Sequence, residues 1–182
     1  FANPSGLVVS DSNYVYVVDK QNHRIQKFNT SGTFQSSWGI NGTGESQFID
    51  PQAIGSDGSN NIYVVDTGNN RVQKFNSSGS FISQWGGFGS GDGQFANPSG
   101  WVVSDSNDVD EVHKQNHRIQ KFNTSGTFQS SWGINGTGES QFIDPQAIGS
   151  DGPNNIHVVD TGNNRVKKFN SSGPFSSYWR GS

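Results

Sequence analysis

The sequence predicts an all-β fold, a β-propeller of four four-stranded blades with a pseudo-twofold internal duplication. The first observation is a period of 47 residues, on which both proline and tryptophan recur. The recurring residues are Pro4, Pro51, Pro98, Pro145, Trp38, Trp85, Trp132 and Trp179. The second is the composition, because 24 Gly and 13 Phe among 182 residues, with 29% hydrophobic content, suit short strands joined by glycine turns. Four strands in a repeat of this length are typical of a propeller blade. We therefore expect one domain over 1–182, with blades at about 1–46, 47–93, 94–140 and 141–182.

Each strand of the first repeat follows from its residue pattern. Residues 7–9 form a short apolar run typical of a buried inner strand, and residues 14–18 are rich in β-branched and aromatic side chains. Residues 24–28 alternate in polarity as a third strand, and residues 33–38 complete the blade as its outer strand. A single blade cannot bury its own faces, so we expect the blades to stack on one another.

Polar segments separate these strands. Residues 11–13 and 29–32 contain Asp, Asn, Ser and Gly, which favour tight turns. Residues 19–23 form a polar connection, and residues 39–47 form a glycine-rich passage into the next repeat. Six N-x-[ST] sequons lie at predicted turns, and the sequence leaves their glycosylation open. They begin at Asn29, Asn41, Asn76, Asn123, Asn135 and Asn170.

The second half of the chain copies the first. Residues 1–88 align with 95–182 without a gap, and we count 13 differences in the 88 aligned positions. Such a duplication favours two equivalent surfaces and hence bivalent binding.

Two stretches carry a family resemblance. Asn61 to Phe75 reads NIYVVDTGNNRVQKF, and Gly91 to Gly100 reads GDGQFANPSG at the opening of a repeat. Both resemble the NHL repeat, and the resemblance extends over essentially the whole chain. It implies a propeller with roughly radial blades, of which family members usually have six. Three arrangements stay open for four blades: a tight closed ring, blades pooled between chains as a homo-oligomer, or further blades that are absent from this sequence.

Charge narrows the range of partners. Asp and Glu number 15 against 12 Lys and Arg, for a net charge of −3, whereas a general nucleic-acid binder usually has a basic surface. There is no cysteine, and no apolar run approaches the roughly 20 residues of a membrane span. We therefore expect a protein or glycan ligand, no nucleic acid, no membrane association and no cofactor. The compartment stays unknown.

The candidate binding residues lie in the polar connections of the four repeats and at one departure from the repeat. Loops on a rigid scaffold are where binding residues usually occur. The departure is Trp101, which replaces Leu7 and either marks a pocket or fills the core. The loop residues are Asn22, His23, Asn69, Asn70, Asn116, His117, Asn163 and Asn164.

A second group of departures is acidic. Asp108, Asp110, Glu111 and His113 replace Tyr14, Tyr16, Val17 and Asp19, and His157 replaces Tyr63 at the position equivalent to Asp110. Carboxylates and imidazoles suit divalent metals, so Asp110 and His157 are the candidate metal pair. Alternation along a strand prevents one strand from presenting all four side chains to one ion, which favours a blade that simply tolerates polar residues. We expect this third blade to be the least stable.

Repetition itself argues against catalysis. Asp19, Asn22 and Arg24 recur in the other repeats, whereas an active site needs a single constellation; the resemblance implies that they tie a strand to a loop. His113 should weaken that tie in the third blade.

The sequence therefore predicts a non-enzymatic binding scaffold that presents blade-end loops to a protein or other repetitive partner. One alternative is a multivalent lectin, in which the repeated tryptophans stack on sugar rings, although we expect them to pack between blades. Another is a metal-dependent hydrolase or lyase that uses the acids Asp11, Asp57, Asp105 and Asp151 after the inner strands.

Overall fold

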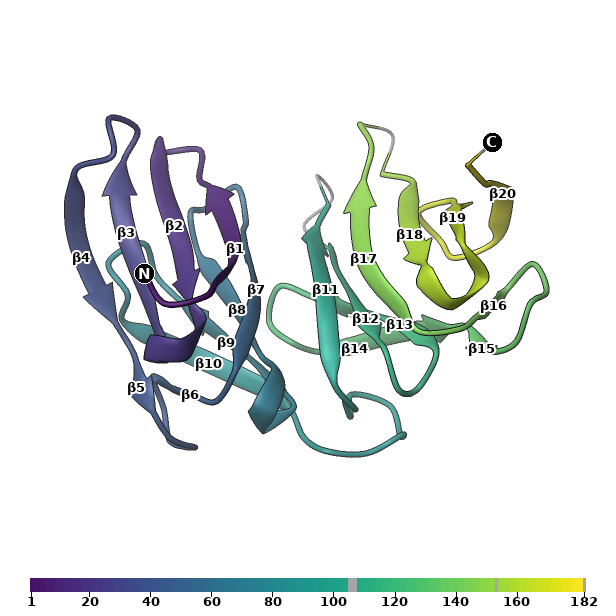
Figure 1. The fold of residues 1–182 in the computed structure, drawn as a ribbon, viewed down its shortest axis with the longest axis horizontal. Helices are drawn as coiled ribbons and strands as arrows, with labels where there is room; N and C mark the ends of the chain where they lie inside the picture. The colour runs from purple at the N-terminus through teal and green to yellow at the C-terminus, as the bar shows by residue number, and fades with distance from the viewer. Residues whose placement is uncertain (105–107, 153, 182) are drawn as a thin grey trace. The chain divides into compact units, whose positions relative to one another are not determined.

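The computed structural model describes residues 1–104, 108–152 and 154–181, and the chain divides into two compact units, Phe1–Phe88 and Gly89–Ser182 (Figure 1). Each unit contains two four-stranded antiparallel sheets and one two-stranded parallel pair. This confirms the all-β fold and the four strands per repeat. The single domain and the closed ring stay predictions.

In the first unit, each blade is a meander whose strands are paired in chain order. The strands of the first blade are β1 (Pro4–Val9), β2 (Tyr14–Asp19), β3 (Arg24–Asn29) and β4 (Phe34–Trp38). Those of the second are β7 (Pro51–Ser56), β8 (Ile62–Asp66), β9 (Arg71–Phe75) and β10 (Phe81–Gly86). Between the blades, β5 (Ile40–Asn41) pairs with β6 (Gln47–Phe48) in parallel, within the glycine-rich passage.

The second unit repeats this pattern. The third blade contains β11 (Pro98–Val103), β12 (Asp108–His113), β13 (Arg118–Asn123) and β14 (Phe128–Trp132). The short pair is β15 (Ile134–Asn135) and β16 (Gln141–Phe142). The fourth blade contains β17 (Pro145–Ser150), β18 (Ile156–Asp160), β19 (Arg165–Phe169) and β20 (Phe175–Trp179).

The inner strand is longer than expected. The apolar run predicted a strand over residues 7–9, but β1 begins at Pro4, because Pro4 pairs with Asp19 across a bulge before the regular ladder starts at Gly6. A bulge lets proline occupy a strand position where its missing N–H is not needed. The same shift occurs at Pro51, Pro98 and Pro145.

The turn chemistry is as expected. The side chain of Asn29 accepts hydrogen bonds from the backbone N–H groups of Ser31 (3.1 Å) and Thr33 (2.8 Å), which closes the β3–β4 turn. Asn76 and Asn123 do the same in their blades. These sequon asparagines therefore have a local structural role.

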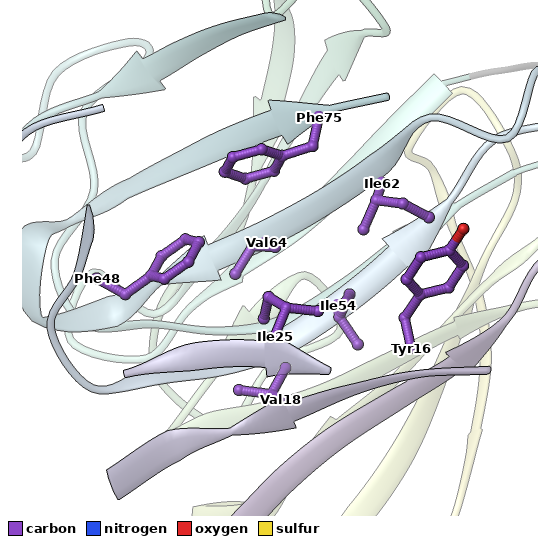
Figure 2. Close-up of a cluster of buried hydrophobic side chains, with 8 residues drawn as sticks. All are labelled: Tyr16, Val18, Ile25, Phe48, Ile54, Ile62, Val64 and Phe75. Atoms are coloured by element: carbon purple, nitrogen blue, oxygen red, sulfur yellow. The ribbon is translucent and has the colours of Figure 1, made fainter. Parts of the chain in front are cut away.

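A hydrophobic core joins the two blades of each unit. In the first unit it holds Val18 and Ile25 from one blade and Phe48, Ile62 and Phe75 from the next, all fully buried (Figure 2). The second unit has the equivalent core. Its buried residues are Val112, Ile119, Phe142, Ile156, Val158 and Phe169.

Strand direction separates the loops into two ends of each blade. Because neighbouring strands are antiparallel, the β1–β2 and β3–β4 turns lie at one end and the β2–β3 turn lies at the other. Loops 11–13 and 20–23 therefore lie at opposite ends of the first blade. The β2–β3 turn is a short 3₁₀ helix in three blades, at η1 (Lys20–Asn22), η2 (Thr67–Asn69) and η3 (Thr161–Asn163).

Within the described residues, the structure contains no helix long and apolar enough to cross a membrane.

Candidate functional site

A buried aspartate at the end of the second strand organises the β2–β3 turn. In the first blade, Asp19 accepts hydrogen bonds from the side chains of Asn22 (3.0 Å), Arg24 (2.8 Å) and Gln26 (2.8 Å). It also accepts the backbone N–H of Ala2 at 2.6 Å. Burial opposes ionisation of Asp19, but these donors outweigh it and lower the pKa of the carboxyl. The predicted tie between strand and loop is confirmed.

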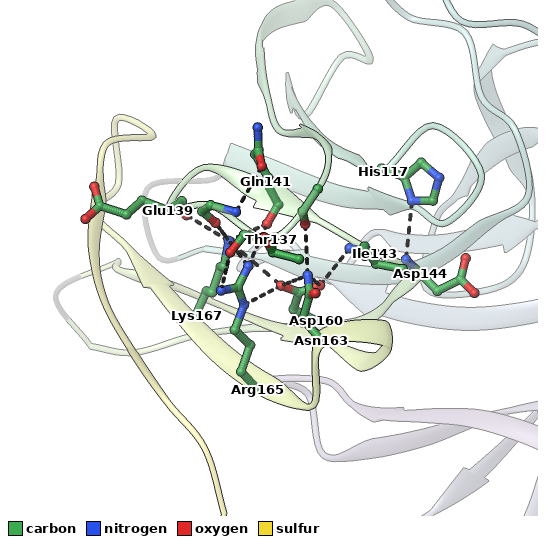
Figure 3. A network of polar contacts seen from close by, with 12 residues as sticks. His117, Thr137, Glu139, Gln141, Ile143, Asp144, Asp160, Asn163, Arg165 and Lys167 are labelled. Carbon is green, nitrogen blue, oxygen red and sulfur yellow. Dashed lines mark hydrogen bonds and ion pairs between the residues drawn. The ribbon is translucent and has the colours of Figure 1, made fainter.

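The tie extends to the passage that arrives from the preceding blade. In the fourth blade, Asp160 accepts from Arg165 at 2.7 Å, while the guanidinium donates onward to the backbone oxygens of Thr137 (2.7 Å) and Gly138 (3.0 Å) (Figure 3). Arg71 of the second blade makes the matching contacts with Asp66, Thr43 and Gly44. One arginine therefore fixes its own turn and the incoming chain.

The third blade lacks this tie, as expected from His113. Arg118 still donates to backbone oxygens of the incoming chain, but its Nε atom is buried without a hydrogen-bond partner. Asn116 donates to Gly89 O at 2.9 Å, and Gln120 lies 3.3 Å from His113 Nε2. Burial and the nearby Arg118 lower the pKa of His113 to about 3, so the imidazole is neutral and gives no substitute for the missing carboxylate.

The candidate binding pairs in the turns have structural roles at both positions. The first residue of each pair is an internal donor: Asn69 donates to Asp66, and Asn163 to Asp160, as Asn22 does to Asp19. The second residue ends the turn in the left-handed region, where Asn and His are tolerated better than branched side chains. Each has a φ of 51°, at His23, Asn70, His117 and Asn164. Backbone geometry thus explains the residue types, and ligand binding by these side chains stays a prediction.

The structure adds residues to this end that the sequence did not point out. Asn41 donates to His23 Nε2 at 3.0 Å, and Lys20 lies 3.6 Å from Asp50, whose side chain is 57% exposed. In the second unit, His117 Nδ1 accepts the backbone N–H of Asp144 at 3.3 Å. We use the term turn surface for these residues and their counterparts. They are Lys20, His23, Asn41 and Asp50 in the first unit, and Lys114, His117, Asn135 and Asp144 in the second.

The period of the sequence contains a signal for this surface. His23 and Asp50 recur after 94 residues, at His117 and Asp144, but not after 47, where Asn70 and Asn97 stand. Residues that every blade needs recur after 47 residues. The residues of the turn surface recur only after 94 residues, which is the length of the two-blade unit.

The acids after the inner strands are engaged at the opposite end. Asp57 accepts from Asn61 Nδ2 (2.8 Å) and from the Tyr63 hydroxyl (2.7 Å). Although burial opposes it, these bonds lower the pKa of Asp57. Asp151 receives His157 Nε2 at 3.2 Å and Lys168 at 3.1 Å. Asp11 is exposed, and Asp105 lies outside the described residues.

Among the ion pairs of the described residues, none joins Asp110 to His157, the candidate metal pair. His157 contacts Asp151, whereas both oxygens of Asp110 are buried without a hydrogen-bond partner. In the part of the chain that the structure describes, no group of three or more His, Asp or Glu side chains is arranged to hold a metal ion. Metal binding by Asp110 and His157 therefore stays a prediction.

Two buried charges of the second unit have altered pKa values. Burial raises the pKa of Asp110 to about 7, with Asp108 adding to the rise and Lys121 opposing it. Burial, helped by Arg165, lowers the pKa of Lys167 to about 8. Lys167 replaces the glutamine of the other blades and donates to the backbone oxygens of Gly138, Glu139 and Gln141 (Figure 3).

The tryptophans behave as packing residues. Trp38 packs on the first core, with its ring 5.7 Å from that of Phe75, and Trp132 packs on the second core. The prediction that they fill the space between blades is confirmed for these two. Trp101 is only 8% exposed, so its indole is not an open platform, whereas Trp179 is 48% exposed.

The family can now be stated. The NHL repeat family matches residues 1–28 and 48–75, which are β1–β3 of the first blade and the same elements of the second. This chain contains NHL repeats. The second unit copies these two NHL repeats at 95–122 and 142–169 with few changes.

Known proteins support the same assignment. Over 54 residues the chain is 39% identical to "Protein brain tumor" of Drosophila melanogaster, a match that covers 30% of this chain and 5% of that protein. Among solved structures, a streptogramin B lyase matches 98% of this chain and 55% of its own length, with a TM-score of 0.76 and 16% identity. Virginiamycin B lyase from Staphylococcus aureus matches with a TM-score of 0.77 and 15% identity over 56% of its length. These likenesses show the fold, and the chain spans about half the length of the propeller structures that it matches.

Proposed function

We propose that this chain is a non-enzymatic binding scaffold whose turn surface contacts a protein or another repetitive ligand. NHL domains commonly mediate binding, and the repeats found here belong to that class. The observation that carries the proposal is the contact of His23 with Asn41 and of Lys20 with Asp50, because it gathers polar side chains of the turn and of the following passage at one end of the blade.

The contacts of the turn surface fit a recognition role. It combines the exposed Asn41 amide and Asp50 carboxylate with the partly buried His23 imidazole and Lys20 ammonium, held by a 3₁₀ turn and a short parallel strand pair. This set offers both donors and acceptors on rigid backbone, which lowers the entropy lost on binding. One copy in each unit makes the scaffold bivalent, so a ligand with repeated epitopes gains avidity.

The absence of catalysis is part of the proposal. The Asp and Arg side chains of the candidate catalytic set are hydrogen-bonded to each other in the first, second and fourth blades. The lyases that share the fold are at most 16% identical, and their activity therefore gives no support to a lyase function here.

The lectin alternative loses its main support. Stacking platforms must be open to the ligand, but Trp38 and Trp132 pack on the cores of their units. A glycan bound at the turn surface remains compatible with its amide and carboxylate groups.

The test is binding of the whole chain to glycan and peptide arrays, with and without divalent cations. Any ligand found is titrated against the double variant His23→Asn with His117→Asn, which keeps the φ of 51° that Asn70 and Asn164 adopt natively. We expect at least a tenfold loss of affinity in the double variant and a smaller loss in each single variant. A matched control is Ser31→Ala with Ser125→Ala, at exposed turns of the opposite blade end, which should bind like the parent chain. Equal affinity of parent and His variant would contradict the proposal.

A further inference from the structure

Two apolar sheet faces of the chain are open. On the first blade, Phe1 and Leu7 are 65% and 66% exposed, beside the partly buried Val15 and Phe28. We call these four residues the front face. On the fourth blade, Val159 and Trp179 are 38% and 48% exposed, beside Val166, and we call these three the rear face. Exposed apolar groups gathered in this way mark interaction sites.

Inside each of the two units, the equivalent faces are covered by a neighbouring blade. The rear face of the first blade consists of Val18, Ile25 and Trp38, the residues equivalent to Val159, Val166 and Trp179. These residues pack against the front face of the second blade. The third and fourth blades repeat the arrangement. The front-face residues involved are Phe48, Ile54, Ile62 and Phe75 in the first unit and Phe142, Ile148, Ile156 and Phe169 in the second.

Burial measures the difference between covered and open faces. Phe48 is 0% exposed and its equivalent Phe1 is 65% exposed; Ile54 is 8% exposed and its equivalent Leu7 is 66%. Val18 is fully buried, whereas Val159 is 38% exposed. Each open residue therefore has a counterpart that is buried when a neighbouring blade is present.

Both open faces are hollowed. A cavity of about 420 Å³ is lined on the rear face by Val159, Val166 and Trp179, with Asn164 and Arg165 at its margin. A cavity of about 270 Å³ is lined on the front face by Phe1, Val15 and Phe28. In the covered interface of the first unit the same positions interdigitate, with Trp38 and Phe75 rings 5.7 Å apart.

We propose that the rear face binds the front face of a second copy of this chain, so that two copies form a closed head-to-tail dimer. The open faces carry the equivalents of the residues that join neighbouring blades inside each unit. The rear face of one copy is therefore complementary to the front face of another, through the same apolar contacts. One chain covers 55% of a matched propeller, so two copies supply the blades of about one ring. In such a dimer each copy contributes one front and one rear face, and neither remains exposed.

One residue defines the contact more closely. Arg180 follows β20 at the position held by Gly39, Gly86 and Gly133 in the other blades. At Gly39 a Cβ atom would lie 2.6 Å from the ring of Phe48, so the covered interface needs glycine there. Gly39, Gly86 and Gly133 also have φ values of 107°, 111° and 104°, a backbone conformation that arginine adopts only under strain, so Arg180→Gly should tighten the association at least severalfold.

The test is the mass of the whole chain by sedimentation and light scattering over a range of concentrations. We expect a species of twice 19.7 kDa for the parent chain and a larger dimer fraction for Arg180→Gly at low concentration. Leu7→Lys and Val159→Lys should each reduce the mass to that of the monomer. Ile40→Lys, a 63% exposed position outside both faces, is the matched control and should remain dimeric.

Mixing makes the head-to-tail geometry falsifiable even if a variant is less stable. Leu7→Lys retains an intact rear face and Val159→Lys an intact front face, so an equimolar mixture should recover a dimer through one interface. Recovery also shows that both variants are folded. A parent chain that stays monomeric at all concentrations, whether its faces are free or closed on each other, overturns the proposal. So does a dimer that persists in both variants.

Discussion

At the scale of single residues, Asp110 and its neighbour Glu111 each place a buried carboxyl in the third blade, and Asp110 does so at a core position. Its equivalent Tyr16 is buried in the first core and donates its hydroxyl to Ser77 O at 3.0 Å. Asp110 is equally buried, but neither carboxylate oxygen has a hydrogen-bond partner. A buried carboxylate without partners is destabilising, and the site responds by raising the pKa to about 7.

We predict a characteristic pH dependence from this residue. A carboxyl whose pKa is raised on folding adds no penalty below its unfolded pKa near 3.8 and the full penalty above about 7. Asp110→Asn should therefore have almost no effect near pH 4. It should raise the free energy of unfolding by at most about 4 kcal/mol at pH 8. Urea unfolding at both pH values measures this, with the exposed Asp11→Asn as the control. An equal effect at both pH values would disprove the assignment.

At the scale of elements, the aspartate at the end of the second strand decides how well each β2–β3 turn is held. Asp66 and Asp160 each accept a backbone N–H from the incoming chain at 2.8 Å, in addition to the Asn and Arg side chains of the turn. His113 cannot accept this set of donors. The third turn consequently depends on side-chain contacts with backbone oxygens of the incoming chain, made by Arg118, Asn116 and Gln120.

We predict that His113→Asp stabilises the third blade. The new carboxylate would receive Asn116 Nδ2 and Arg118 Nε, which is unpaired in the present chain. Hydrogen bonds to a charged group contribute about 1.5–3 kcal/mol each, so a rise of the melting temperature by several degrees is expected. Calorimetry of the whole chain provides the measurement, and the reverse change Asp66→His should lower the melting temperature. A lower melting temperature for His113→Asp would mean that the imidazole has a stabilising role of its own.

At the scale of the whole molecule, each unit has its own two-blade core, and the polar departures fall almost entirely in the second. Tyr16 of the first core is replaced by Asp110, Asp19 by His113, and Gln73 by the buried Lys167. We therefore expect the two units to differ in stability while sharing a fold.

We predict that a fragment of residues 1–88 unfolds at a higher urea concentration than a fragment of residues 89–182. The two fragments are of similar length, so their urea dependence should be similar and the midpoints can be compared directly. Circular dichroism of both fragments measures the difference. Restoring Tyr, Tyr, Val and Asp at positions 108, 110, 111 and 113 should reduce the difference between the two urea midpoints. An unchanged difference would place its cause outside the third blade.

The sequence by itself determined the repeat, the four strands of each blade, the β3–β4 turns and the tie around Asp19. These features depend on contacts between residues that are close in the chain, such as Asp19 with Arg24 or Asn29 with Ser31, and the repeat shows the first pairing in three blades and the second in all four. The sequence also correctly assigned Trp38 and Trp132 to packing between blades.

Only the tertiary structure decided which loops lie at the same end of a blade and which polar groups are already occupied. It placed Asn41 against His23 and Asp50 against Lys20, and it showed that Asn22 donates inward. These contacts join segments separated by a whole blade-to-blade passage, and they form because the parallel pair of β5 and β6 returns the chain to the preceding turn. The open front and rear faces have the same origin, since exposure depends on whether a neighbouring sheet covers a residue, while apolar residues occupy these positions in every repeat.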